Sequence, residues 1–158
     1  MLFELPILWT VLINIALWFI IHMSMAYIIT MIPSNWINVN SIIFTEKKIE
    51  KNGKIYENLF KIKSWKELLP DGAALFDKGF KKKRLVSFEE SYIRQFVLET
   101  CRGELAHWLV IAFSPIFFIW NPMWAGNVMI IYAILANLPC IITQRYNRIR
   151  FNKILGRR

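Results

Sequence analysis

The chain has 158 residues, of which 56% are hydrophobic and 15% aromatic, and its formal net charge is +9 at pH 7. Soluble domains contain roughly 45–50% apolar residues. Here the excess is gathered in long runs, which excludes an ordinary soluble domain and predicts one integral membrane domain over residues 1–158. No set of aromatic and basic residues resembles a nucleic-acid module, so we expect no nucleic-acid partner. The basic balance instead predicts a membrane orientation and attraction to anionic lipids.

Residues 6–29 form the first apolar run, long enough for a membrane helix of ~20 residues. The first charged residue is Glu4, and no small-residue cleavage site follows, so we expect a retained transmembrane helix rather than a secretory signal. Pro33 marks its end. Three polar side chains lie near that end: His22, Ser24 and Tyr27. A lone histidine in such a place is typical of a packing or interfacial residue.

Residues 33–94 form a basic segment that we expect in the cytoplasm or at the membrane interface. Residues 41–45 and 54–56 fit either short strands or irregular interfacial pieces, joined by a turn at Asn52-Gly53. Ser64 and Glu67 have the spacing of a capping box, which predicts a short helix that begins after Ser64.

The basic cluster at residues 81–84 is explained by orientation and by attraction to anionic lipid, at ~1 kcal/mol per charge. Docking of an acidic carrier or of a phosphate-bearing donor is the alternative. Ser87, followed by Glu89 and Glu90, predicts the start of the next helix, with Ser87 as its N-cap.

Two more apolar segments predict transmembrane helices over residues 95–120 and 123–143. Pro115 predicts a kink, and the uncharged stretch 120–127 predicts a tight interfacial turn. The last segment is interrupted by Asn137 and Pro139, so a helical hairpin that re-enters the membrane is the alternative to two spans. The fold class is therefore an all-α integral membrane protein with about three transmembrane helices, or one helix plus a helical hairpin.

The distribution of charge predicts the topology. Residues 46–94 carry thirteen Lys or Arg and eight Asp or Glu, and the basic tail 144–158 carries six Lys or Arg and no acid. An outside N-terminus with a cytoplasmic middle segment and tail satisfies the positive-inside rule in a multi-pass cell-membrane protein. That topology places residues 99–107, the end of the first helix and residues 137–148 at one depth.

The most informative stretch runs from Glu99 to Trp108, where ionisable residues meet an apolar helix. Such groups are costly in a membrane and mark a functional site by default, although two intrahelical ion pairs at a solvated helix end would also explain them. Helical spacing places Glu104 within reach of His107, and Arg102 within reach of Glu99. We expect His107 to be a general base that Glu104 or Glu99 orients. Arg102, Arg145 and Arg148 are expected to bind a phosphate, a carboxylate or a developing oxyanion of the substrate, and Asn137 or Gln144 to donate neutral hydrogen bonds to it.

Other chemistries have weaker signals. Cys101 and Cys140 form neither a C-x-x-C motif nor a metal-ligand spacing, so we expect no metal site and read both thiols as packing residues. A nucleophilic Cys101, next to Arg102, is the less favoured alternative. There is no G-x-S-x-G motif, and direct transfer with a histidine base fits better than a covalent enzyme intermediate.

Three blocks carry a resemblance to a known family: Glu99-Thr-Cys-Arg-Gly-Glu-Leu-Ala-His-Trp108, Tyr132-Ala-Ile-Leu-Ala-Asn-Leu-Pro139 and Gln144-Arg-Tyr-Asn-Arg148. They resemble the glycosyl-4,4'-diaponeurosporenoate acyltransferases. Trp65-Lys66 and Asp71-Gly72 extend the similarity, whereas Gly103, where alanine is expected, and the first thirty residues depart from it.

The resemblance implies transfer of a fatty acyl group to a sugar hydroxyl of a membrane glycolipid, with a glycosyl carotenoid as the type acceptor. It also implies functional roles for the polar residues of the three blocks, and it adds Trp108 and Asn147 to the expected substrate-binding residues. An acyl thioester, either acyl-CoA or an acyl carrier protein, is the expected co-substrate, and we expect no cofactor. Two rival hypotheses remain at this point: a non-enzymatic membrane subunit or lipid-binding partner, and a transporter-like protein.

Overall fold

The computed structural model describes residues 5–69 and 87–156, and within these ranges the regular elements are all helices. Three of them are long and apolar enough to cross a membrane: α1 (Ile7–Met31), α3 (Glu90–Phe113) extended by the 3-10 helix η6 (Ser114–Ile119), and α4 (Met123–Gly156). The predicted all-α membrane fold with three spanning helices is therefore confirmed.

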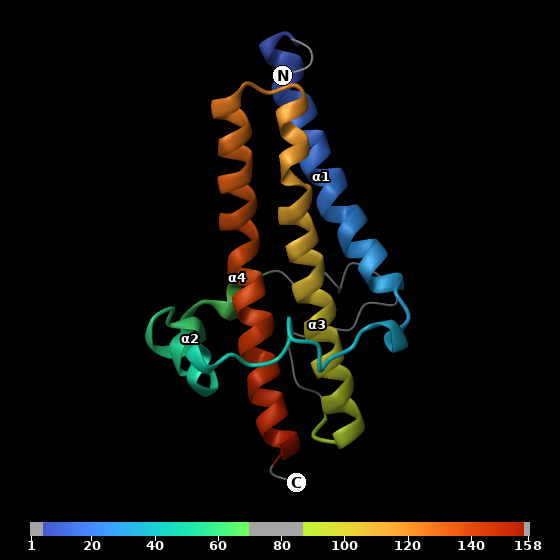
Figure 1. Cartoon of the computed structure of the whole chain (residues 1–158), viewed down its shortest axis with the longest axis vertical. Helices are drawn as coiled ribbons and strands as arrows, with labels where there is room; N and C mark the ends of the chain where they lie inside the picture. Colours follow the sequence, from blue (N-terminus) through green and yellow to red (C-terminus); the bar gives the residue numbers. More distant parts are fainter. Residues whose placement is uncertain (1–4, 70–86, 157–158) are drawn as a thin grey trace.

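The three long helices lie side by side, with α3 packed against both α4 and α1 (Figure 1). Their outer faces expose large apolar side chains, such as Leu8 and Phe19 of α1, each 68% exposed, as expected for surfaces that contact lipid. The core between the helices centres on Trp18, whose ring stacks on Phe117 at 4.6 Å between centroids. Ala133 of α4 completes this contact at 0% exposure.

Pro115 changes the helix type, as a proline inside an apolar helix is expected to do. The α-helix ends at Phe113, and the chain continues as the 3-10 helix η6. Proline has no N–H to donate to the carbonyl four residues earlier. The Ser114 hydroxyl donates to that carbonyl, on Ile111, at 2.7 Å. The following turn is shorter than the predicted 120–127, because α4 begins at Met123.

The helix α4 is one continuous element of 34 residues that passes through Pro139. At 1.5 Å per residue it is ~51 Å long, well beyond a hydrocarbon core of ~30 Å. The residues predicted as a basic tail therefore continue the last membrane helix as far as Gly156. They stay helical because Tyr146 and Ile149 bury themselves against the segment that links α1 to α3.

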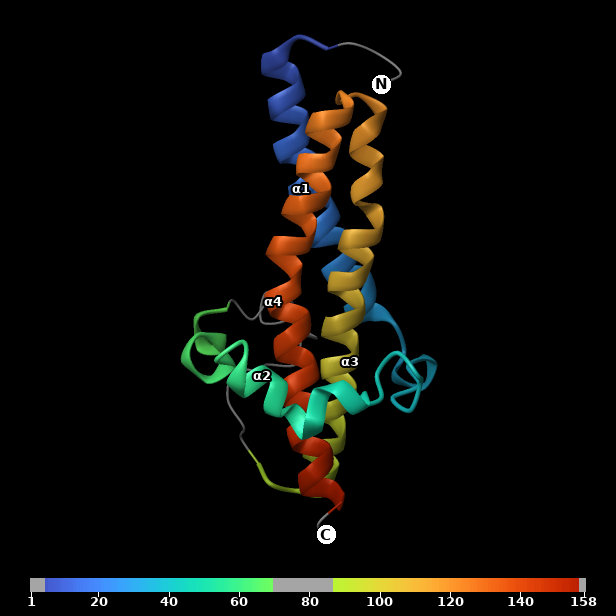
Figure 2. The same ribbon diagram turned by 60° about the vertical axis from the view of Figure 1, so that its left-hand side comes forward.

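That linking segment consists of short helical turns: η1 (Ser34–Trp36), η2 (Lys48–Gly53), α2 (Lys54–Asn58), η3 (Ile62–Ser64) and η4 (Lys66–Leu68). Figure 2 shows η2 and α2 crossing α3 and α4. The strand alternative for residues 41–45 and 54–56 is wrong, because the chain turns at the first and is helical at the second. Asn52 and Gly53 have φ angles of 60° and 84°, as the predicted turn requires.

Two predicted caps differ from the structure. Ser64 ends η3 and donates its hydroxyl to the Lys61 carbonyl at 2.8 Å, so the predicted capping box with Glu67 does not form. Ser87 accepts a hydrogen bond from the Glu89 amide, but α3 starts at Glu90, two residues later than an N-cap at Ser87 implies. The predicted basic cluster at 81–84 lies outside the described residues.

Candidate functional site

His107 of α3 and Asn137 of α4 face each other inside the bundle. The His107 Nδ1 and Asn137 Oδ1 atoms lie 2.8 Å apart, with Asn137 fully buried and His107 half-buried. Counted along α4 from Met123, Asn137 is ~21 Å from the α3–α4 turn. A hydrocarbon core is ~30 Å thick, so a helix that enters it at Met123 would carry Asn137 inside it.

The hydrogen bonds of Asn137 fix the tautomer of His107. The Asn137 amide nitrogen donates to the Ala133 carbonyl at 2.8 Å. A carbonyl only accepts, so the amide nitrogen faces Ala133 and the amide oxygen faces His107. That oxygen also only accepts, so His107 Nδ1 carries the hydrogen. In a neutral imidazole the lone pair then lies on Nε2, which is the atom able to take a proton.

Glu104, predicted to orient His107, has other hydrogen-bond partners. Its side chain is 0% exposed and binds two arginines of α4: Arg145 at 2.8 Å through Oε1, and Arg148 through Oε2. The Trp108 indole N–H also donates to Oε1, at 3.2 Å. Glu104 therefore joins α3 to α4, a role that the i+3 spacing to His107 did not predict. The residue placed to orient His107 is Asn137, which the sequence had assigned to substrate binding.

All five N–H donors of Arg145 are engaged within the protein. They reach both carboxylate oxygens of Glu50, at 2.9 and 3.0 Å, one oxygen of Glu104, and the backbone carbonyls of Ile43 and Thr45. A guanidinium in this state has no donor left for a phosphate or a thioester oxygen. The geometry favours a structural role for Arg145 over the predicted substrate-binding role.

Arg148 is 2% exposed and donates to Glu104 and, at 3.0 Å, to the Phe44 carbonyl. With Glu50 and Glu104 it completes a buried set of two acids and two arginines, which we call the ion-pair network (Glu50, Glu104, Arg145, Arg148). The network is neutral overall, as buried charges usually are. It fastens the segment around residues 43–50 to α3 and α4.

Glu50 is the member of the network that the sequence did not single out. It is 3% exposed and accepts hydrogen bonds from Arg145, the Tyr56 hydroxyl and the Lys47 amide. Burial acts to raise the pKa of Glu50, but these hydrogen bonds outweigh it and hold that pKa below its usual value. In the sequence, Glu50 is one of several acids among the lysines of this segment, so nothing distinguishes it from a solvated charge such as Glu46.

Arg102 links α3 to the end of α1. Its guanidinium donates to the carbonyls of Ile29 and Thr30, at 3.2 and 2.9 Å, and to the Ser34 hydroxyl. These carbonyls belong to the last turn of α1, where a positive charge is favoured by the helix dipole. Glu99 lies 3.2 Å from Arg102, as the i+3 spacing predicted. Both residues are buried, which favours a structural role for Arg102.

The remaining predicted residues lie on α4 and at the surface of α3. Gln144 and Asn147 are half-buried, and the Gln144 Oε1 atom is buried with no hydrogen-bond partner among the described residues. Trp108 is 42% exposed. His22 packs its ring against Trp18 at 5.7 Å. In residues 5–69 and 87–156, no group of three His, Cys, Asp or Glu side chains is placed to hold a metal ion.

The comparisons with known proteins match most of the chain. The family model described as glycosyl-4,4'-diaponeurosporenoate acyltransferase matches residues 40–157. The chain belongs to this acyltransferase family. It is 34% identical, over 138 residues, to the proteins of that name from Staphylococcus aureus strains USA300, NCTC 8325 and MRSA252. The alignments cover 87% of this chain and 83% of each relative.

No solved structure matches the chain. The family model and the relatives identify the chain as an acyltransferase and hence as an enzyme, and they confirm the predicted resemblance. The family match spans both helices that carry the polar residues, since it covers His107, Asn137 and the whole ion-pair network.

Proposed function

We propose that this acyltransferase moves a fatty acyl group from a thioester donor to a sugar hydroxyl of a membrane glycolipid, with His107 as the general base. The name of the relatives suggests a glycosyl carotenoid as the acceptor. The observation that carries the proposal is the His107–Asn137 hydrogen bond of 2.8 Å, which places the lone pair of a neutral ring on Nε2, the nitrogen that can act as a base.

We propose a direct transfer in two steps. Nε2 of His107 takes the proton of the sugar hydroxyl while the hydroxyl oxygen bonds to the thioester carbonyl carbon. The carbon–sulfur bond then breaks, and the imidazolium returns the proton to the thiolate that leaves. Asn137 accepts a hydrogen bond from Nδ1 throughout, so it keeps the ring in place as a positioning residue rather than a catalytic one.

The distribution of basic residues suggests the side from which the acyl donor approaches. We assign the N-terminus to the outside and the basic segment and the end of α4 to the cytoplasm, following the positive-inside rule. Acyl-CoA and acyl carrier protein, both anionic and cytoplasmic, would then approach the basic face, which also attracts anionic lipid. Gln144 and Asn147 remain the candidates for hydrogen bonds to substrate, because Arg145 has no free donor and Arg148 is buried.

The test is acyl transfer by purified protein in lipid nanodiscs, with a long-chain acyl thioester and an alkyl glucoside. His107→Ala should lower kcat/KM at least ~100-fold, the usual share of a general base. Asn137→Asp keeps an acceptor for Nδ1–H and should retain more activity than Asn137→Leu. Phe113→Leu, a change at a 47% exposed residue of the same helix, is the control for an altered surface. Full activity of His107→Ala would refute the proposal.

A further inference from the structure

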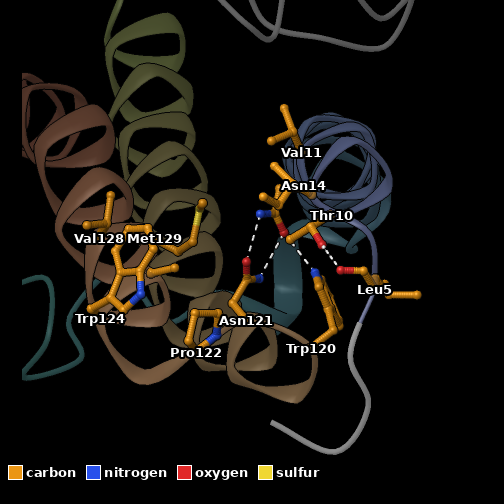
Figure 3. A pocket seen from close by; sticks show the side chains of 12 residues that line it. Leu5, Thr10, Val11, Asn14, Trp120, Asn121, Pro122, Trp124, Val128 and Met129 are labelled. Atoms are coloured by element: carbon orange, nitrogen blue, oxygen red, sulfur yellow. Dashed lines mark hydrogen bonds between the residues drawn. The ribbon is translucent and has the colours of Figure 1, made fainter.

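A pocket of about 390 Å³ lies near the end of the bundle that carries the α3–α4 turn, away from His107 (Figure 3). The pocket takes its walls from the first turns of α1, from the turn itself and from the first turns of α4. Most of its lining side chains are apolar, including Val11, Pro122, Trp124, Ala125, Val128 and Met129. A cavity of this size and composition is typical of a ligand site.

Most polar side chains of the pocket form hydrogen bonds with one another. Asn14 Oδ1 accepts from the Trp120 indole at 2.8 Å and from Asn121 Nδ2 at 2.9 Å, and Asn14 Nδ2 donates to Asn121 Oδ1 at 3.0 Å. Asn121 Nδ2 donates its second hydrogen to the Phe117 carbonyl. These hydrogen bonds join α1 to the α3–α4 turn and so fix the two elements that form the pocket walls. With the amides paired, the pocket favours a hydrocarbon ligand over a sugar or a charged group.

The distance between the pocket and His107 is comparable to the length of a lipid chain. Along α4, the pocket residues Met129 to Ala125 are eight to twelve residues from Asn137, which corresponds to ~12–18 Å of helix. The surface between them is aromatic and apolar. Trp18 donates to Met129 Sδ at 3.3 Å, and its ring lies 5.0 Å from that of Tyr132, which is 47% exposed. A long apolar chain that starts at His107 would have to cover this interval of α4 to reach the pocket.

We propose that the pocket holds the far end of the long apolar chain of a lipid substrate whose reacting group lies at His107. This inference rests on the proposed function and adds a determinant of chain length to it. The chain belongs either to the acyl donor or to the glycolipid acceptor, and both present the same chemistry to the pocket.

The first test is chain-length preference in nanodiscs. Ala125→Phe fills the pocket, Val128→Phe fills it at a position that is 50% exposed, and Ile131→Phe, at 55% exposure and outside the pocket, is the matched control. The rate is measured with octanoyl- or palmitoyl-CoA and with octyl or octadecyl glucoside. The two pocket variants should lower the rate with one long substrate more than with its short counterpart, because a filled pocket leaves no room for the end of the longer chain.

The substrate whose length matters identifies the chain that enters the pocket. Equal losses with long and short substrates, or the same loss in Ile131→Phe, would overturn the proposal.

The second test needs no turnover and so separates this inference from the proposed function. His107→Ala protein is photolabelled with octadecyl glucoside and with palmitic acid, each carrying a terminal diazirine. At least one probe should form adducts on residues 120–129 that an excess of the unlabelled compound competes away and that Ala125→Phe abolishes. Labelling that neither excess ligand nor Ala125→Phe reduces, for both probes, would show only bulk lipid contact and refute the pocket site.

Discussion

Replacing Glu104 by Gln should destabilise the protein strongly, because it leaves a buried arginine without its counter-charge. Glu104 is 0% exposed and is the carboxylate that pairs with Arg148, itself 2% exposed. Arg145 keeps its second acid, Glu50. The loss therefore falls mainly on one buried guanidinium, and breaking such a pair costs ~3–5 kcal/mol.

The control is Glu90→Gln, which breaks an exposed ion pair with Arg94 whose side chains are 51% and 67% exposed. That pair is expected to contribute only ~0.3–0.5 kcal/mol. The free energy of unfolding is measured by SDS titration of protein in mixed micelles, followed by tryptophan fluorescence. The double variant Glu104→Leu with Arg148→Met removes both charges and should recover most of the loss, since apolar replacements of a buried pair are often neutral.

Equal stability of Glu104→Gln and the unchanged protein would refute this reasoning. So would a double variant that is no more stable than Glu104→Gln, because the cost would then lie in lost packing rather than in an unpaired charge.

Two further predictions concern the linking segment and the α3–α4 turn. The pKa of Glu50 is lower in the folded than in the unfolded state, so its stabilisation is complete above pH ~4.3 and is lost as pH falls through the folded pKa. Proteolysis of the segment around residues 43–56 should therefore accelerate below that pH, and Glu50→Gln should show fast cleavage at every pH. A Cβ on Gly126 would meet carbon atoms of the Phe118 ring at 2.2 Å, whereas one on Gly156 would meet nothing within 4 Å. Gly126→Ala should thus lower the free energy of unfolding by ~1–3 kcal/mol in the same SDS titration. Gly156→Ala should leave the midpoint of the titration unchanged. Equal midpoints for the two variants would show that the Phe118 ring moves aside freely.

The sequence predicted well what depends on local composition. Long apolar runs predicted α1, α3 and α4, because a membrane helix needs only length and hydrophobicity. Pro115 predicted a kink, and next to it the α-helix gives way to the 3-10 helix η6. Helical spacing also predicted the contact between Glu99 and Arg102, which are neighbours on one helix.

The sequence could not predict which residues meet across the bundle. Spacing placed Glu104 beside His107, but it did not predict that Arg145 and Arg148, 41 and 44 residues away, bind its carboxylate. Asn137 meets His107 from 30 residues away. These pairings depend on the rotation of α4 against α3, and an apolar helix with polar residues on several sides does not specify it. The length of α4 was also hidden, because its basic end is held by contacts with residues before α3.

The hydrogen bonds of Arg102 also set an order of assembly. The carbonyls of Ile29 and Thr30 receive their partner from a residue more than 70 positions later in the chain. During synthesis α1 enters the membrane before that partner exists, and the end of α1 is joined to the bundle only once α3 has followed. A chain that ends before residue 102 lacks this connection, so the position of the end of α1 depends on α3 and not on the sequence of α1 alone.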